Sequence, residues 1–286
     1  MLHSIEAAGR TRTFIVVGDP DGPPDRPLVL VFHGSRQSGA IHRRFTGETL
    51  DELAADGRAV VAYLDGYRGN WNDARAASAF PARRENVDDV EFVREVIRSL
   101  AVSHRIDTSA VVGVGYSNGG QMVLRLLHEA DGLLAGAAVV AATMPERENF
   151  LAEFGGSAVR PVPVAIVAGT ADPVARFEGG TMAWWARTLF RIGGRSLSAR
   201  ATADYFARRN GITTTPSTGR GAPPTPGRAA IETLEYRQAG HAPVTLYVVQ
   251  GGGHTVPGPT PGPRLMGRTG EHPGLREIVA DLLAPR

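Results

Sequence analysis

The chain has 286 residues, of which 42% are hydrophobic, and its formal net charge is +2. This apolar content excludes an intrinsically disordered chain, and the length fits a single domain over residues 1–286. All 31 basic residues are arginine, and because they alternate with acids or apolar residues instead of forming a basic stripe, no nucleic-acid partner is expected.

Few features of the sequence indicate the cellular compartment of the protein. No apolar stretch approaches the roughly 18 residues of a membrane-spanning helix, and residues 1–10 lack the apolar run of a signal peptide. Cysteine is absent, so no disulfide framework exists. These features favour a cytoplasmic protein with no membrane partner. The alternative is a secreted protein whose leader is missing from this sequence.

The first third of the chain alternates between strand-like and helical segments. Apolar residues run almost without interruption through the expected strands, whereas the helices repeat them every three to four residues. Asp88 and Asp89 stand at a helix start, where carboxylates complement the helix dipole, and are interpreted as structural. Strands are expected at 13–17, 28–32 and 59–64, and helices near 41–55 and at 87–103.

A nucleophile elbow is predicted at Ser117. The apolar strand 111–116 runs into the Gly-Tyr-Ser-Asn-Gly turn 115–119, and the amphipathic helix 121–129 follows. Such a turn holds a serine hydroxyl exposed beside a base, and its glycines avoid clashes where backbone meets backbone. The alternative is a glycine-rich strand end that merely turns through a serine. The flanking strand and helix favour the nucleophile.

Two later strands lead into a carboxylate and a histidine. The apolar segment 161–169 ends in a small-residue turn that carries Asp172. The strand 244–249 is followed by the glycine-rich loop 250–258, which carries His254. Asp172 is the candidate acid and His254 the candidate base. The alternatives are a carboxylate that caps a turn and a surface histidine in a Pro/Gly loop.

Residues 174–228, between the acid and base strands, are expected to form a small cap-like insert. Its aromatic part includes Trp184 and Trp185, one of which is expected on the wall of the substrate pocket. The stretch 213–228 is rich in Pro, Gly and Thr and is expected to loop out. The remaining expected elements are a strand at 135–141 and a helix near 275–283.

Parallel strands with helices on both faces, and the chain order Ser117, Asp172, His254, indicate an α/β-hydrolase fold. In this fold His254 would take the proton of Ser117 and return it to the leaving group, while Asp172 orients the imidazole. The backbone N–H groups of Ser35 and Asn118 would form the oxyanion hole.

The remaining histidines are not assigned to catalysis. His33 ends the strand at 28–32 and could be a rival base, but a histidine at such a position is more often packed, so it is interpreted as structural. The others lack the spacing and acidic neighbours of a metal site. No metal or organic cofactor is therefore expected.

Four motifs follow one another along the chain. The first is His33-Gly34 with Gln37-Ser38, the second the helix start 87–90, the third the turn 115–120, and the fourth the acid segment 169–173 together with the histidine loop 251–258. Together they resemble the polyhydroxybutyrate depolymerase / feruloyl esterase group of carboxylesterases, often called the LpqC type. The resemblance covers about 12–258. It implies Ser117, Asp172 and His254 as the triad and Ser35 and Asn118 as the oxyanion positions. Trp71-Asn72 resembles the family's tryptophan-containing loop.

The chain departs from this group in several ways. Ser35 stands where the family usually has a cysteine, and the family's disulfides and usual secretion are not matched. Because cysteines and a leader are absent and no second domain that could grip a polymer is visible after Gly258, short soluble esters are expected as substrates rather than insoluble polymer. Arg176, near the site mouth, would favour a carboxylate-bearing or phenolic substrate. The expected substrate contacts are Trp71, Tyr116, Arg176, Trp184 and Trp185.

The sequence thus predicts a serine carboxylic-ester hydrolase that acts through an acyl-enzyme on short hydroxyacyl or hydroxycinnamoyl (feruloyl-type) esters. A small-molecule ester is the expected partner. The alternatives are an extracellular polyhydroxybutyrate depolymerase or acetylxylan esterase, a serine peptidase or acyltransferase with the same triad, and a non-catalytic binding protein on a hydrolase fold.

Overall fold

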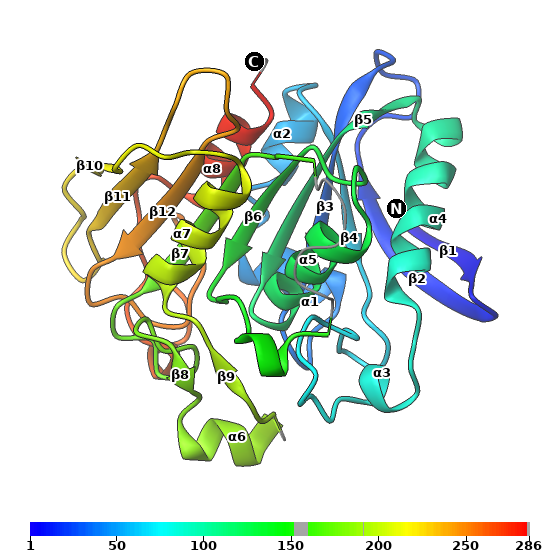
Figure 1. Cartoon of the computed structure of the whole chain (residues 1–286). Helices are drawn as coiled ribbons and strands as arrows, with labels where there is room; N and C mark the ends of the chain where they lie inside the picture. Colours follow the sequence, from blue (N-terminus) through cyan, green and yellow to red (C-terminus); the bar gives the residue numbers. More distant parts are fainter. Residues whose placement is uncertain (152–159, 191, 285–286) are drawn as a thin grey trace.

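A computed structural model describes residues 1–151, 160–190 and 192–284 (Figure 1). Its strands are β1 (Leu2–Ala7), β2 (Arg10–Val17), β3 (Arg26–Phe32), β4 (Val60–Leu64), β5 (Ile106–Tyr116), β6 (Gly136–Val140), β7 (Val164–Gly169), β8 (Gly180–Thr181), β9 (Arg195–Ser196), β10 (Ser217–Arg220), β11 (Ile231–Tyr236) and β12 (Val244–Val249). Ten of them form one sheet in the order β1-β2-β4-β3-β5-β6-β7-β12-β11-β10. The neighbours from β4 to β12 pair in parallel, and the pairs at both edges are antiparallel.

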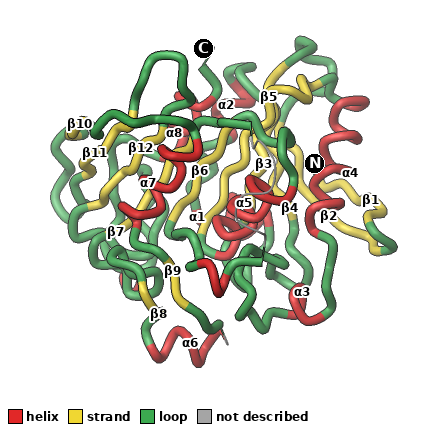
Figure 2. The backbone as a smooth tube through the Cα atoms, viewed as in Figure 1, coloured by secondary structure: helices red, strands yellow, loops and turns green. Residues whose placement is uncertain are grey.

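Helices cover both faces of this sheet (Figure 2). They are α1 (Gly39–Phe45), α2 (Asp51–Ala55), α3 (Pro81–Arg84), α4 (Asp89–Ser103), α5 (Asn118–Glu129), α6 (Trp184–Phe190), α7 (Ala199–Arg209) and α8 (Leu275–Leu282), with short 3₁₀ turns at Arg147–Asn149 and Arg264–Met266. Buried side chains of α4, α5 and α7 share one core cluster, and those of α2 and α8 share the other. This is the predicted α/β-hydrolase arrangement.

The uninterrupted apolar strands follow from this layering. In β3, Leu28, Leu30 and Phe32 belong to one core cluster, whereas Val29 and Val31 belong to the cluster on the opposite face. Successive side chains of a strand point to opposite faces, so a strand covered on both sides needs an apolar residue at every position. The parallel strands also end at one edge of the sheet, where the candidate site residues lie.

Two predicted elements differ in the structure. The helix expected near 41–55 is two short helices, because the chain between α1 and α2 turns through Gly47 and Glu48 at φ values of 67° and 56°. The first predicted strand, now β2, pairs with β1, which sequence patterning missed. A two-residue turn joins them, with Ala8 and Gly9 at φ values of 48° and 73°.

The segment expected as a cap-like insert contains two kinds of structure. The hairpin β8–α6–β9 projects from the sheet (Figure 1), whereas α7 packs on β7 and β12 and buries Phe206. Residues 217–220, expected to loop out, instead form the edge strand β10 against β11.

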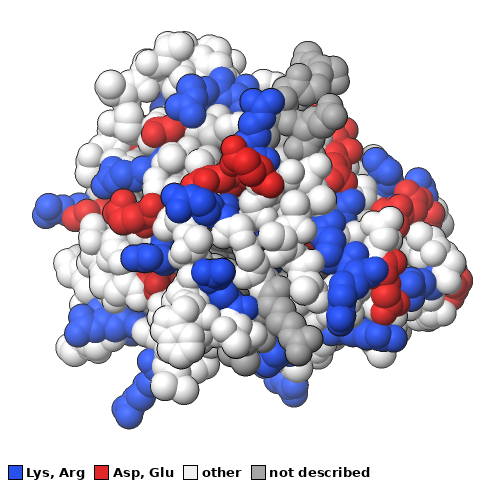
Figure 3. Space-filling model, turned by 60° about the horizontal axis from the view of Figure 1, so that its bottom comes forward, with Lys and Arg blue, Asp and Glu red and all other residues white. Residues whose placement is uncertain are grey.

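Charged side chains of both signs are interspersed on the face shown in Figure 3. Exposed ion pairs on the molecule include Arg98–Glu91 at 3.0 Å and Arg237–Glu235 at 2.7 Å. Among the described residues, no helix has both the length and the apolarity needed to cross a membrane.

The neighbouring acids at the start of α4 do different structural work. Asp89 is fully buried, and its carboxylate accepts hydrogen bonds from the Arg12 guanidinium and from the Asn72 N–H, both at 2.7 Å. Asp88 is the N-cap of α4, and its side chain accepts from the Glu91 N–H at 2.9 Å. Asp89 therefore ties α4 to β2 and to the loop before α3.

Replacing Asp89 should destabilise the fold far more than replacing its neighbour. Asp89→Ala leaves the buried Arg12 guanidinium without its anion and should lower the free energy of unfolding by about 3–5 kcal/mol. Asp88→Ala removes only a helix cap and should cost about 1 kcal/mol. Urea unfolding followed by circular dichroism measures both values, and equal losses would contradict the anchoring role of Asp89.

Candidate active site

Ser117 occupies a strained turn between β5 and α5. Its φ and ψ are 54° and −113°, a conformation that non-glycine residues seldom adopt. Its N–H donates to Val140 O of the neighbouring β6 at 2.8 Å, which fixes the turn to the sheet edge. The side chain is partly exposed at the C-terminal ends of the central strands.

The glycines on either side of this serine are required by backbone contacts. A Cβ on Gly115 would lie 2.2 Å from Gly119 O, and a Cβ on Gly119 would lie 2.0 Å from Phe32 O. Both distances are far shorter than van der Waals contact. The start of α5 therefore packs directly against the end of β3, and glycine alone allows that approach.

Ser117, His254 and Asp172 form a hydrogen-bonded series. His254 Nε2 lies 2.9 Å from Ser117 Oγ, and His254 Nδ1 lies 2.8 Å from Asp172 Oδ2. A carboxylate oxygen only accepts, so Nδ1 donates to Asp172 and Nε2 is left to accept the serine proton. The other oxygen of Asp172 accepts from the N–H groups of Val174 and Ala175, at 2.7 and 2.8 Å.

The loops that carry Asp172 and His254 press against each other through glycines. A Cβ on Gly169, at the end of β7, would lie 2.4 Å from Gly252 O. A Cβ on Gly253 would lie 1.8 Å from Met266 O, next to the hydrogen bond from His254 N–H to Met266 O at 2.7 Å. This backbone contact brings the carboxylate and the imidazole together.

The predicted oxyanion donors are free in the described part of the chain. The N–H of Gly34 donates to Gln37 Oε1 at 2.9 Å, but the N–H groups of Ser35 and Asn118 have no acceptor among the described residues. Asn118 is the first residue of α5, where backbone N–H groups lack intrahelical partners. Its side chain is held by Trp71 N–H at 2.9 Å and Asp73 Oδ2 at 2.5 Å.

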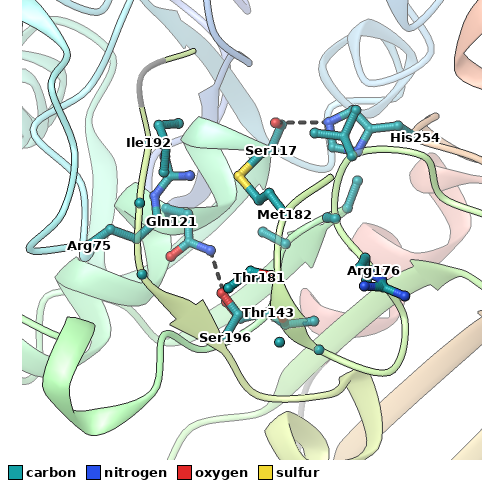
Figure 4. A pocket seen from close by; sticks show the side chains of 18 residues that line it. Arg75, Ser117, Gln121, Thr143, Arg176, Thr181, Met182, Ile192, Ser196 and His254 are labelled. Atoms are coloured by element: carbon teal, nitrogen blue, oxygen red, sulfur yellow. Dashed lines mark hydrogen bonds between the residues drawn. The ribbon is translucent and has the colours of Figure 1, made fainter. Parts of the chain in front are cut away.

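A cavity of about 510 Å³, counting its open mouth, lies beside Ser117 and His254 (Figure 4). Its walls come from the loop after β4, the start of α5, the loop after β6, and the segment from Val174 to Ser196. The lining side chains other than Ser117 and His254 include Arg75, Gln121, Thr143, Arg176, Met182 and Ile192.

His33 is packed, in agreement with its interpretation from sequence. Its Nδ1 donates to Gly34 O at 2.7 Å, and its Nε2 accepts from Gly66 N–H at 2.8 Å. Burial lowers the pKa of His33 to about 4, so the ring is neutral near pH 7 and both nitrogens serve the fold. The described residues contain no group of three or more His, Asp or Glu side chains placed to hold a metal ion.

Two of the predicted substrate contacts are wrong. Trp71 is fully buried; its Nε1–H donates to His33 O at 3.0 Å and its ring packs edge-on to Phe32. Tyr116 is also buried, with its ring 5.2 Å from that of His254 and its hydroxyl donating to His254 O at 2.8 Å. Neither lines the cavity. Both support residues at the site instead of facing a ligand.

The other predicted contacts divide between the cavity and the hairpin. Arg176 lines the cavity at its rim. Trp184 and Trp185 do not line it; they are 78% and 38% exposed on α6, because the hairpin carries them away from the sheet.

Sequence reasoning missed several cavity residues. Gln121 could have been found, because it stands four residues after Ser117 on a predicted helix and so faces the same side. Arg75 and Ile192 lie in segments with no periodic pattern, and nothing in the sequence marks them.

No family model matches the chain. Putative esterase NocK of Nocardia uniformis subsp. tsuyamanensis is 31% identical over 294 residues, which cover 98% of this chain and 81% of NocK. Feruloyl esterase B of Piromyces equi is 27% identical over 82% of this chain, which spans 40% of that protein. Among solved structures, acetyl xylan esterase from Aspergillus awamori has a TM-score of 0.61 at 16% identity, covering 90% of this chain and 94% of that chain.

These comparisons agree with the family resemblance predicted from the motifs. The structural likeness, at its low sequence identity, supports the fold alone. The similarity to NocK extends over nearly the whole chain and carries the family assignment. The chain therefore belongs to the α/β-hydrolase esterases related to NocK and is a carboxylesterase.

Proposed function

We propose that the protein hydrolyses small carboxylic esters through an acyl-enzyme on Ser117, with His254 as general base and Asp172 as its orienting carboxylate. The observation that carries this proposal is the hydrogen-bonded series from Ser117 Oγ through His254 to Asp172, with distances of 2.9 and 2.8 Å. The series opens on a cavity, which gives an ester carbonyl access to the hydroxyl.

The proposed reaction has two halves. Ser117 Oγ attacks the ester carbonyl while His254 Nε2 takes the hydroxyl proton, and the free N–H groups of Ser35 and Asn118 receive the oxyanion. The intermediate collapses as His254 returns the proton to the departing alcohol, which leaves the acyl group on Ser117. Water, deprotonated by His254, then attacks the acyl carbon and releases the acid and the free serine.

Short hydroxyacyl or hydroxycinnamoyl esters are the proposed substrates. The supporting facts are the relationship to a protein named feruloyl esterase B and the cavity that opens beside Ser117. Threonine, serine and glutamine side chains on the cavity wall offer partners to hydroxyl groups of such acids. A panel of p-nitrophenyl acyl esters, methyl ferulate, hydroxybutyrate oligomers and peptide amides tests this choice; faster cleavage of the amides would refute it.

Ser117 and His254 should act as one unit. Ser117→Ala should lower kcat by about 10⁴-fold or more, because attack then lacks its oxygen, and His254→Ala should lower it to a similar extent. The double variant should cost little beyond either single change. Turnover of methyl ferulate or a p-nitrophenyl ester by the four proteins provides the measurement. If the fold-loss of kcat in the double variant equals the product of the two single losses, His254 does not act as the base for Ser117.

Tyr116 is expected to position His254. Tyr116→Phe removes the hydroxyl that holds His254 O and should lower kcat on the order of tenfold with little change in KM, because small displacements of a catalytic group are costly. Tyr236→Phe is a matched control: Tyr236 is also buried and donates to Asp204 at 2.7 Å, and it pairs with Val244 at the start of β12, the opposite end of that strand from His254. Equal activity of the two variants would argue against a positioning role.

A further inference from the structure

The guanidinium of Arg75 is fixed on one edge and free on the other. Its Nε and Nη2 both donate to the carboxylate of Asp73, a fully buried residue that does not line the cavity. Arg75 itself does line the cavity. Its Nη1 has no hydrogen-bond partner in the described part of the chain and is not sealed from solvent. The unpaired donors are therefore available to a ligand.

The structural role of the Arg75–Asp73 ion pair accounts only for the edge of the guanidinium that faces Asp73. Asp73 also accepts from Asn118 Nδ2 at 2.5 Å, so the pair helps to hold the first residue of α5 beside Ser117. A planar guanidinium held bidentately has a fixed orientation, and its remaining N–H groups suit a carboxylate. The guanidinium also lies over the Phe80 ring, with Cζ 5.9 Å from the ring centroid, but no hydrogen-bond acceptor among the described residues takes its outer N–H groups.

The surrounding charge is positive. Arg83 reaches the same place, where its Nη2 donates to the backbone oxygens of Asp73 and Arg75. The Nε of Arg83 is buried without a partner. The Arg83 guanidinium is thus a second cation beside the Arg75–Asp73 ion pair, held by backbone oxygens.

Arg176 adds a second cation on the far wall. It lies across the cavity from Arg75 (Figure 4), and its exposed side chain has no ion-pair partner among the described residues. The described residues that line the cavity include no Asp or Glu. An anionic group on the substrate would therefore meet two arginines and no acidic side chain in the cavity wall.

We propose that the substrate is an ester that also carries a free carboxylate, which the outer edge of Arg75 binds while Arg176 draws it to the cavity mouth. This inference rests on the proposed ester hydrolysis at Ser117 and adds the substrate class. It makes Arg75 and Arg176 residues that determine specificity.

Matched esters test the inference. The probes are the monomethyl esters of succinic, glutaric, adipic and suberic acids, each compared with a neutral methyl ester in which an isopropyl group replaces the carboxylate. The best monoacid ester should exceed its neutral match in kcat/KM by at least about tenfold, the value of one hydrogen bond to a charged group. This ratio should fall as salt is added, because the rim arginine is exposed.

Variants assign the preference to the two arginines. Arg176→Gln should lower the ratio of kcat/KM between the monoacid ester and its neutral match several-fold. Arg75→Lys, which keeps the positive charge but loses the bidentate guanidinium, should lower this ratio further. Arg187→Gln changes an exposed arginine of α6 that does not line the cavity and should leave the ratio unchanged. Should Arg75→Lys fold poorly in a thermal melt, the double change Asp73→Asn with Arg75→Gln, which removes both charges of the ion pair together, takes its place.

Binding separates this inference from the proposed function. Calorimetry of the Ser117→Ala protein with monomethyl adipate and its neutral match needs no turnover. Tighter binding of the monoacid ester, lost in the Arg75 variant, supports the inference even if no ester is hydrolysed. If the protein cleaves neutral esters through Ser117 but neither prefers nor binds the monoacid esters more tightly, the carboxylate proposal is wrong and the hydrolase proposal stands.

Discussion

The close contact between the start of α5 and the end of β3 is the constraint on which the site depends. Because a Cβ on Gly119 would lie 2.0 Å from Phe32 O, the helix can begin this near the strand only with glycine there. The turn that results holds Ser117 in its strained backbone conformation and leaves the N–H of Asn118 without an acceptor among the described residues. A strained residue of this kind persists only where surrounding structure enforces it.

A second backbone contact of the same kind brings the other two side chains to Ser117. Gly169 meets Gly252 at the ends of β7 and β12, so the loops after these strands cannot separate without breaking the sheet edge. The central strands are parallel, and their C-terminal ends therefore lie along one edge. Residues as far apart in sequence as Ser117 and His254 come within hydrogen-bond distance for this reason.

The sequence allowed candidate catalytic residues to be predicted where the local backbone needs particular residue types, such as glycine in a tight turn. Glycine-rich turns after apolar strands identified Ser117 and His254 as candidates, and the structure brings them together. Prediction from the sequence failed where exposure depends on tertiary packing. Trp71 follows a strand as a ligand-binding aromatic could, yet its indole N–H finds His33 O and the ring is buried. Arg75 had no signal, because its pairing with Asp73 and its place on the cavity wall exist only in the folded chain.

The central claim is that Ser117 is the nucleophile of a carboxylesterase, and covalent labelling tests it most directly. The protein is treated with a fluorophosphonate and the modified residue is found by peptide mass mapping. We expect one adduct per chain, on Ser117, which forms as ester hydrolysis is lost and forms much more slowly in His254→Ala. An adduct on another residue, or full hydrolysis by protein whose Ser117 is completely modified, would contradict it.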